Sequence, residues 1–494
     1  MRRFRTVAAL VILLPACAAR SAPPLRPADD PQELLRRDLQ LLFDADDLAH
    51  VHWGVHFYSL RDRATLYRLN AGQFLVPASN QKILTTAAAA ERLGWDFRFS
   101  TRLLATAPIG DDGTIDGDVI VVGTGDPTIN PRHPERWRAF DDWAATLKAK
   151  GITIINGTLI GDDNAFAEPG WGVGWAWDNL QYGYGAPPTA LQFNENQVEV
   201  LVGPGMDAGS RAIISTSPLG SGLVVDHDVT TAAAGEETRI EIMRVPGTAF
   251  LTVRGRVAAD AKPVSLTASV ANATRFYLNA LREALGRNGI FVSGGIADVD
   301  ELRAPPRLDH LVELLVDQSP PLQQIVDVTM KWSRNIYAES LLLAMVPPGE
   351  PATSARGLDS MQETLQKWGI PEDQYLPRDG SGLSRYDYVS ADVLIALLTY
   401  LAAEPRHAEV FQSTLPVAGL SGTLANRMKG TPAEGRVRAK TGTLSNVRAL
   451  SGYLTTLDGD TIVFSMLANN FQLPASAIDA VMDRALQRVI AFRH

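Results

Sequence analysis

The chain has 494 residues, of which 46% are hydrophobic and 20% charged, with one cysteine and a formal net charge of −9. This ordinary globular composition excludes a collagen-like, coiled-coil or wholly disordered chain, and the acidic balance argues against a nucleic-acid partner. At roughly 150 residues per domain, the length fits about three domains, or one large domain that carries insertions.

The N-terminus has the pattern of a secretory signal peptide. Basic residues at 2–5 precede an apolar run at 7–14, and small residues follow. The apolar run is too short to span a bilayer as a helix. The pattern therefore predicts a signal peptide at residues 1–18, a Pro-rich tether at 19–31, and export to the periplasm or cell envelope.

Cys17 is the only cysteine, so an internal disulfide is excluded and stability must come from a large core. Two interpretations of this residue stay open. Signal peptidase could cleave after Ala18 and discard it, or Leu14-Pro-Ala-Cys17 could be a lipobox whose cysteine becomes a lipid anchor. Pro15 fits a lipobox poorly, whereas the position of the sole cysteine favours lipidation.

Hydrophobic periodicity and turn residues predict the elements in chain order. An amphipathic helix at 32–44 is followed by a hairpin, 53–59 and 64–69, and by a helix at 77–92 that stops at Gly94. Short β-like runs then dominate, at 118–122, 152–160, 198–202, 211–214, 239–243 and 250–257, with helices near 136–149 and 274–289. Helices at 321–331, 335–346, 354–368 and 390–403, strands at 447–456 and 461–468, and a helix at 475–492 complete the chain.

This order indicates an α/β fold of the α+β kind, with helices around an antiparallel sheet. The simplest organisation is one catalytic domain, built from residues 32–98 and 312–494, that is split by a long β-rich insertion at 99–311. We expect two nested subdomains within the insertion.

The first chemical motif is Ser79-Asn-Gln-Lys82, at the start of the helix predicted over 77–92. Residues three apart share a helix face, so the amine of Lys82 can reach the hydroxyl of Ser79. A desolvated, neutral lysine can take the serine proton, and the helix N-terminus favours developing negative charge. Taken alone, the pattern favours an N-cap serine beside a surface lysine.

The second motif is Ser333-Arg-Asn335, in a link between two predicted helices. A serine there could pass a proton to a leaving amine, and an asparagine could orient a lysine and a substrate carbonyl. The alternative is a helix–helix turn that uses both residues for local capping.

The third motif is Lys440-Thr-Gly-Thr443, at the start of the late β region. Lysine and threonine side chains can bind a carboxylate, and Gly442 lets an extended ligand lie against the strand edge. The alternative is a turn that leads into a buried strand.

Together the three motifs, in this order, are the set typical of penicillin-binding proteins and β-lactamases. About 250 residues separate Ser79 from Ser333, and about 110 separate Ser333 from Lys440. A compact β-lactamase would place its second motif much sooner. The chain therefore resembles the class C low-molecular-mass penicillin-binding proteins, the D-alanyl-D-alanine carboxypeptidase/endopeptidases.

Further stretches that resemble this family span nearly all of the chain after the signal peptide. They are Gly125-Asp-Pro-Thr128, Gly161-Asp-Asp163, Tyr184-Gly-Ala-Pro187, Asn194-Glu-Asn196, Asp379-Gly-Ser-Gly-Leu-Ser384 and Leu415-Pro-Val-Ala-Gly-Leu420. The family usually carries Ser-Asp-Asn at the second motif, and Arg334 replaces the Asp here. Because the middle position is not thought to take part in the chemistry, we discount this departure.

The resemblance implies a serine-type enzyme that cleaves peptidoglycan stem peptides through an acyl-enzyme and that β-lactams inhibit. Ser79 would be the nucleophile and Lys82 the general base. Ser333 would relay a proton to the departing D-Ala, and Asn335 would orient Lys82 and the substrate amide. Lys440, Thr441, Gly442 and Thr443 would hold the substrate carboxylate and backbone, and no metal or cofactor is expected.

Asp162 is the remaining candidate, in the turn after an apolar strand. It could cap this turn through its own backbone. The resemblance implies instead that it receives the free amino group of a diaminopimelate side chain in the stem peptide.

Two other functions compete with the carboxypeptidase. One is a β-lactamase or esterase that uses the same acyl-enzyme, and the other is a cell-wall-binding protein that keeps the fold with little catalysis. The intact set of three motifs argues against the second of these.

Overall fold

The computed structural model describes residues 30–131, 133, 136–167, 170–304, 306 and 310–493. The predicted signal peptide, Cys17 and all but the last two residues of the tether lie outside these described residues. None of the helices in the described part of the chain combines the length and apolar character that a bilayer crossing requires.

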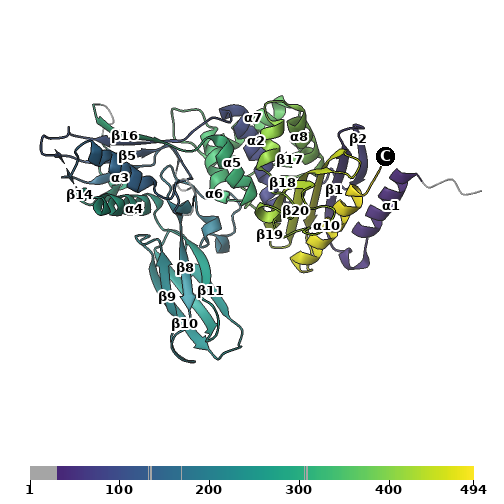
Figure 1. Cartoon of the computed structure of the whole chain (residues 1–494), viewed down its shortest axis with the longest axis horizontal. Coiled ribbons are helices and arrows are strands. Elements are labelled where there is room, and N and C mark those ends of the chain that lie inside the picture. The colour runs from purple at the N-terminus through teal and green to yellow at the C-terminus, as the bar shows by residue number, and fades with distance from the viewer. Residues whose placement is uncertain are drawn as a thin grey trace, which may run out of the picture.

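One half of the molecule is built around a five-stranded antiparallel sheet in the order β19-β20-β21-β1-β2 (Figure 1). Its strands are β1 (His52–Ser59), β2 (Ala64–Leu69), β19 (Val437–Leu444), β20 (Val447–Thr455) and β21 (Thr461–Asn469). Because β1 pairs with β21, this sheet brings the two ends of the sequence together. The predicted hairpin and late strand pair are confirmed.

Alternate residues of β21 point to opposite faces of the sheet, and each face packs against its own helices. Ile462 and Phe464 belong to a buried cluster with α1 (Pro31–Phe43) and α10 (Ala475–Ile490). Val463 belongs to a second cluster on the other face. That face is covered by α2 (Gln81–Leu93), α5 (Leu322–Lys331), α6 (Asn335–Ala344), α7 (Ser354–Lys367), α8 (Ala391–Ala403) and α9 (Ala408–Thr414), with the short pair β17 (Tyr375–Leu376) and β18 (Tyr388–Val389).

The insertion begins with a second, mixed five-stranded sheet in the order β15-β7-β5-β3-β16. Its strands are β3 (Ser100–Ala105), β5 (Val119–Gly123), β7 (Leu159–Asp162), β15 (Ile296–Asp298) and β16 (Val312–Gln318), with α3 (Ala139–Ala149) and α4 (Ala273–Arg287) packed nearby. A small parallel sheet joins β4 (Thr114–Ile115), β6 (Ile154–Ile155) and β14 (Phe291–Val292). The strand predicted over 152–160 is thus two strands, because Asn156 and Gly157 break it and its halves enter different sheets.

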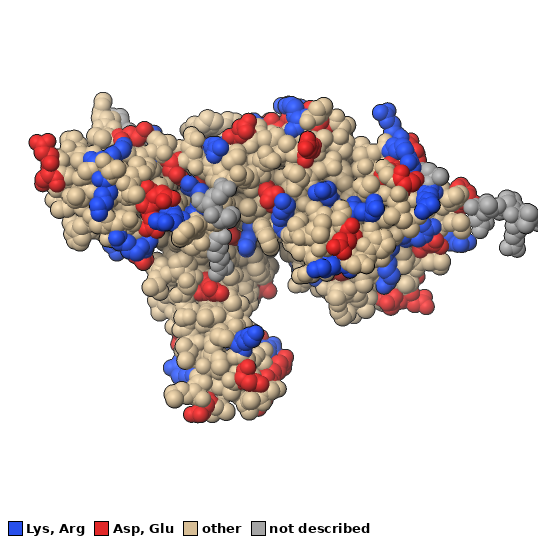
Figure 2. Space-filling view, in the orientation of Figure 1, with Lys and Arg blue, Asp and Glu red and all other residues tan. Residues whose placement is uncertain are grey.

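The rest of the insertion forms an arm, residues 197–269, that stands out from the body of the molecule (Figures 1 and 2). One antiparallel sheet joins β8 (Gln197–Gly203), β9 (Ile213–Ser217) and β13 (Val264–Ser269), and a mixed one joins β10 (Val224–Ala232), β11 (Arg239–Arg244) and β12 (Phe250–Ala258). One continuous apolar cluster includes Val121 of the first part and Val253 of the arm. The insertion therefore has two parts that share one core.

The boundary between insertion and catalytic domain lies later than the predicted position at 311. Strand β16 pairs antiparallel with β3 of the insertion sheet, and Leu314 belongs to the insertion core. Leu322, at the start of α5, already belongs to the catalytic core. The insertion thus extends to Gln318. The boundary was predicted too early because β16 is an edge strand in which only Leu314 is fully buried, so its hydrophobic pattern is weak.

Candidate active site

Ser79 lies in a single 3₁₀ turn, Ala78–Asn80, that directly precedes α2. Ala78 has a φ of 46°, in the left-handed region that residues with a Cβ rarely adopt. The side chain of Asn80 donates a hydrogen bond to Ser451 Oγ at 2.7 Å and so ties the turn to β20. The strained backbone at Ala78 and the hydrogen bond of Asn80 therefore fix the turn that carries Ser79, as is common at functional sites.

Lys82, one turn later, is fully buried, and its amine has three oxygen neighbours. Nζ lies 2.9 Å from Ser79 Oγ, 2.7 Å from Asn335 Oδ1 and 2.6 Å from the carbonyl oxygen of Ser381. The last two can only accept hydrogen bonds. A neutral amine would donate its two N–H bonds to them and keep its lone pair for the hydroxyl proton of Ser79, as a general base requires.

Burial also shifts the protonation of this lysine in the direction that such a base needs. Desolvation lowers the pKa of Lys82 to about 8, although the carboxylates of Asp379, Glu339 and Asp387 oppose the shift. The pKa of Lys440, which is also fully buried, is lowered by desolvation and by the charge of Lys82. At pH 7 about a tenth of Lys82 is therefore unprotonated, a far larger share than at the ordinary lysine pKa.

This shift predicts a pH profile for acylation. If only neutral Lys82 activates Ser79, the acylation rate rises about tenfold per pH unit below 8 and levels off above it. The measurement is the second-order rate of acylation by a penicillin between pH 6 and 9.5. A flat profile, or a rise that begins only near the ordinary lysine pKa, would contradict this assignment.

The second motif lies between the two buried lysines. Lys440 Nζ donates to Ser333 Oγ at 2.9 Å and to the carbonyl oxygen of Thr441 at 2.8 Å. Asn335, the first residue of α6, donates from Nδ2 to the carbonyl oxygen of Tyr184 at 2.8 Å. Because that contact fixes the amide, its Oδ1 faces Lys82.

The third motif lies on β19, which is an edge strand of the catalytic sheet, as predicted. The first half of β19 is covered by residues 416–418. The N–H of Ala418 donates to the carbonyl oxygen of Val437, and the N–H of Ala439 donates to that of Pro416. From Lys440 to Leu444, the described part of the chain pairs β19 only with β20. This open edge carries Thr441 and Thr443 into the same cavity as Ser79.

Gly442 is required by packing against the nucleophile turn. A Cβ at this position would lie 2.7 Å from the carbonyl oxygen of Pro77 and 3.2 Å from the Cβ of Ala78. The prediction explained this glycine by room for a substrate. The structure adds that β19 and the turn before Ser79 touch here, so that the glycine sets the position of the nucleophile.

Replacing Gly442 with Ala should therefore slow acylation more than it weakens ligand binding. The added methyl group must push the turn that carries Ser79 away from β19, and a displacement near 1 Å costs about a hundredfold in rate. Stopped-flow acylation separates the two effects. A change confined to the dissociation constant would show that this residue acts only through the ligand.

A cavity of about 500 Å³ joins the three motifs. Its lining includes Ser79, Ser333, Asn335, Thr441 and Thr443. Beside them are Tyr184 and three residues that the sequence analysis did not single out, Asp178, Asn179 and Arg385. Asp178 and Asn179 belong to the 3₁₀ turn Trp177–Asn179 of the insertion, so both parts of the molecule line the cavity.

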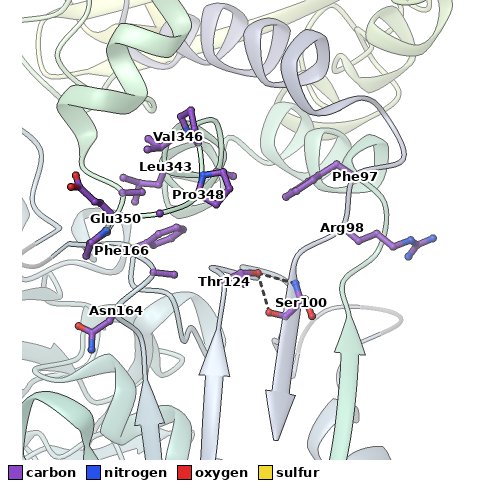
Figure 3. Close-up of a pocket in the computed structure, with 16 residues that line it drawn as sticks. Phe97, Arg98, Ser100, Thr124, Asn164, Phe166, Leu343, Val346, Pro348 and Glu350 are labelled. Atoms are coloured by element: carbon purple, nitrogen blue, oxygen red, sulfur yellow. Dashed lines mark hydrogen bonds between the residues drawn. The ribbon is translucent and has the colours of Figure 1, made fainter. Parts of the chain in front are cut away.

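A larger cavity, of about 580 Å³, lies elsewhere between the insertion and the catalytic domain (Figure 3). Its walls are mostly apolar, with Phe97, Phe166 and Val346 among them, and Ser100 and Thr124 hydrogen-bond to each other. None of the predicted site residues lines it. The chemistry of the three motifs belongs to the smaller cavity.

Asp162 is the predicted site residue that lies outside the three motifs, in the insertion. It ends β7, and its Oδ1 accepts a hydrogen bond from the backbone N–H of Asn164 at 3.2 Å. It is not among the residues that line the cavity around Ser79. The contact is the turn-capping alternative considered for this residue.

A cluster of three carboxylates, Asp163, Asp298 and Asp300, lies in the insertion, with oxygen atoms within 4.8 Å of one another. Carboxylate oxygens are hard ligands that suit Ca²⁺ or Mg²⁺. Asp298 already accepts hydrogen bonds from Asn272 and from the N–H of Asp300. No residue of the three motifs belongs to this cluster.

Known proteins match the chain over nearly its full length. Residues 35–489 match the D-Ala-D-Ala carboxypeptidase 3 (S13) family. The chain belongs to this family. It is therefore an enzyme, and the activity of the S13 family is that of a serine-type D-alanyl-D-alanine carboxypeptidase.

Two relatives support membership of the S13 family. The D-alanyl-D-alanine carboxypeptidase of Actinomadura sp. (strain R39) is 34% identical, over 99% of this chain and 91% of the relative. The D-alanyl-D-alanine carboxypeptidase DacB of Haemophilus influenzae is 30% identical, over 81% of this chain and 82% of the relative.

Solved structures agree with the S13 fold. Penicillin binding protein 4 of Haemophilus influenzae has a TM-score of 0.79 at 27% identity, covering 92% of this chain and 98% of its own. The same protein has also been solved in complex with a β-lactam, with a TM-score of 0.74 at 26% identity. The predicted α+β fold of the penicillin-binding proteins is confirmed.

Sequence reasoning missed the site groups of this S13 enzyme that act through the backbone. The carbonyl oxygens of Ser381 and Tyr184 fix Lys82 and Asn335, respectively. Both residues lie in stretches, Asp379–Ser384 and Tyr184–Pro187, whose resemblance to the family was noticed without a role. The available signal was that these two stretches resemble the family although they lie outside the three motifs.

Proposed function

We propose that Ser79, Lys82, Ser333, Asn335 and Lys440 are the catalytic residues of this carboxypeptidase, and that stem peptides ending in D-Ala-D-Ala are its substrates. The contact between Nζ of the fully buried Lys82 and Oγ of Ser79, which lines the cavity, supports this most. The β-lactam complex of the related penicillin binding protein 4 supports β-lactams as covalent inhibitors.

The proposed reaction begins with transfer of the Ser79 proton to Lys82 as Oγ attacks the carbonyl carbon of the penultimate D-Ala. Backbone N–H groups of Ser79 and Thr443 stabilise the oxyanion. The C–N bond then breaks as the proton held by Lys82 passes through the Ser333 hydroxyl to the amine of the departing D-Ala, which leaves Lys82 neutral again. Thr441, Gly442 and Thr443 hold the substrate carboxylate and backbone, and water finally hydrolyses the ester and restores the Ser79 hydroxyl.

Purified stem pentapeptide and cross-linked muropeptides test this proposal by mass spectrometry. Loss of a single D-Ala from the pentapeptide is expected of a carboxypeptidase, and cleavage of cross-linked dimers would show endopeptidase activity as well. Penicillin should leave a long-lived adduct. Rapid penicillin turnover without action on either peptide would instead establish the β-lactamase alternative.

We propose that Asp178, rather than Asp162, receives the amino group of the stem-peptide side chain. Asp178 and Arg385 both line the cavity around Ser79 and carry opposite charges. The end of a diaminopimelate side chain carries an ammonium and a carboxylate, which match this pair. A hydrogen bond between charged groups contributes about 1.5–3 kcal/mol, which corresponds to roughly ten- to a hundredfold in specificity.

Replacing Asp178 with Asn should lower kcat/KM for diaminopimelate-bearing peptides by about tenfold, with little change for peptides that lack this amine. Asp162→Asn is the matched control, since it makes the same chemical change outside the cavity. Steady-state kinetics on both peptides decides the assignment. Loss in the Asp162 variant alone would return the role to that residue.

We also propose export to the periplasm or cell envelope, because stem peptides occur there and the N-terminus has the pattern of a signal peptide. Intact-mass analysis of the membrane fraction decides whether Cys17 carries a lipid. A mature N-terminus at residue 19 or later would exclude the anchor.

A further inference from the structure

Arg334 is the middle residue of the second motif, where the resemblance to the family led us to expect Asp. Its Nε lies 3.5 Å from Oε1 of Glu195, in the insertion, and the two form an ion pair. The side chain of Glu195 is only 10% exposed, whereas that of Arg334 is 41% exposed. A mostly buried carboxylate thus faces a residue between Ser333 and Asn335.

Glu195 is held in place by its surroundings. Asn130 Nδ2 donates to its Oε1 at 3.1 Å, and Gln197 Nε2 donates to its Oε2 at 3.4 Å. The carboxylate therefore keeps a defined position beside the second motif.

The backbone on both sides of this ion pair is strained. Asn194, Glu195 and Asn196 have φ angles of 50°, 57° and 53°, and Ser333 has a φ of 58°. Asparagine adopts this left-handed conformation readily, whereas glutamate does not. A glutamate in the middle of such a turn indicates that its side chain, and not the backbone, is needed there.

The same link of the second motif has another contact with the insertion. Asn335 Nδ2 donates to the carbonyl oxygen of Tyr184, which leaves Oδ1 at 2.7 Å from Lys82 Nζ. The insertion therefore contacts two consecutive residues, Arg334 and Asn335. The side-chain amide of Asn335 that contacts Tyr184 also contacts Lys82.

We infer that Glu195 and Arg334 are positioning residues: their ion pair holds the second motif against the insertion, so that Asn335 can orient Lys82. An acidic side chain at position 334 would be repelled by the carboxylate of Glu195. The repulsion would move the segment that carries Ser333 and Asn335 away from the insertion. The side chain that suits the middle position of the motif then depends on the residue that it faces, here Glu195, although the middle residue takes no part in the chemistry. This inference rests on the proposed role of Lys82.

The test is a set of charge variants with penicillin acylation as the readout. Arg334→Glu places a carboxylate near the position of the guanidinium, so we expect the acylation rate constant to fall by about tenfold or more. Glu195→Gln keeps the contact with Asn130 but removes the charge, and should cost about threefold alone. In the double variant, Glu195→Gln should bring the acylation rate constant of Arg334→Glu back to within about threefold of the wild-type value.

The rescue distinguishes positioning from a general loss of stability. A merely structural role would lower the melting temperature and the fraction of molecules that label, and leave the rate constant of those that label unchanged. The matched control is Arg61→Glu, alone and with Asp458→Asn, because this 3.3 Å pair has similar exposure, 42% and 26%, on two turns of the catalytic domain. We expect wild-type acylation from both control variants.

Each outcome is decisive. A normal rate in Arg334→Glu would overturn the inference, and so would a slow Arg334→Glu that Glu195→Gln leaves unimproved. If the wild type forms no adduct at Ser79, the proposed function itself fails, which is a different result from a failed rescue.

Discussion

Replacing Lys82 with Ala should slow acylation of Ser79 by a factor of about a thousand, because the general base is lost and no other amine replaces it. Lys82 Nζ is 2.9 Å from Ser79 Oγ, whereas Lys440 Nζ bonds to Ser333 Oγ and to the carbonyl of Thr441. Stopped-flow acylation by a penicillin measures this effect.

The loss of a fully buried side chain could also disturb the fold, so the prediction needs a second variant. Lys82→Met fills nearly the same space without an amine and should be as slow as Lys82→Ala. Lys331→Ala is the control for loss of a lysine, since Lys331 pairs with Asp327 on the surface of α5. An acylation rate within tenfold of the wild type in both Lys82 variants would exclude this residue as the base.

Replacing Ser79 with Ala should remove carboxypeptidase activity almost completely, by about a millionfold, because no covalent intermediate can form. The fold should persist, since Ala78 and Asn80, which hold the turn, are unchanged. The readout is release of D-Ala from a stem pentapeptide. Melting temperature serves as the check on folding.

Ser333→Ala gives the matched comparison, because it removes one hydroxyl from the same cavity. Water can partly replace a proton relay, so this variant should be slowed far less than Ser79→Ala. Equal losses in the two variants would mean that Ser79 is not distinguished as the nucleophile.

The catalytic domain was largely predictable from the sequence, because its elements are long and strongly periodic. Helix α2 and the hairpin β1-β2 follow their hydrophobic patterns, although α2 begins at Gln81 and the predicted first turn, with Ser79, is a 3₁₀ turn. Strand β16 was not recognised, since it is an edge strand in which only Leu314 is fully buried. Strands β10 and β13 in the arm were also missed; both are edge strands whose residues are mostly exposed or half-buried.

The three motifs were predictable because each carries its chemistry in side chains at a fixed spacing. What escaped prediction depends on contacts between distant segments. The carbonyl oxygen of Ser381 reaches Lys82 because two distant segments of the catalytic domain fold together. Glu195 reaches Arg334 because the insertion packs against that domain. The sequence pattern at Asp162 suited a ligand as well as a turn, and the proposal of Asp178 instead rests on its place in the lining of the cavity.

The assignment of Ser79 as the nucleophile is tested by peptide mapping of the wild-type enzyme after incubation with penicillin. One penicilloyl group per molecule is expected, on the peptide that contains Ser79, and fragmentation should place it on that serine. An adduct on Ser333 or on any other residue, or no adduct in an enzyme that still releases D-Ala, would contradict the assignment.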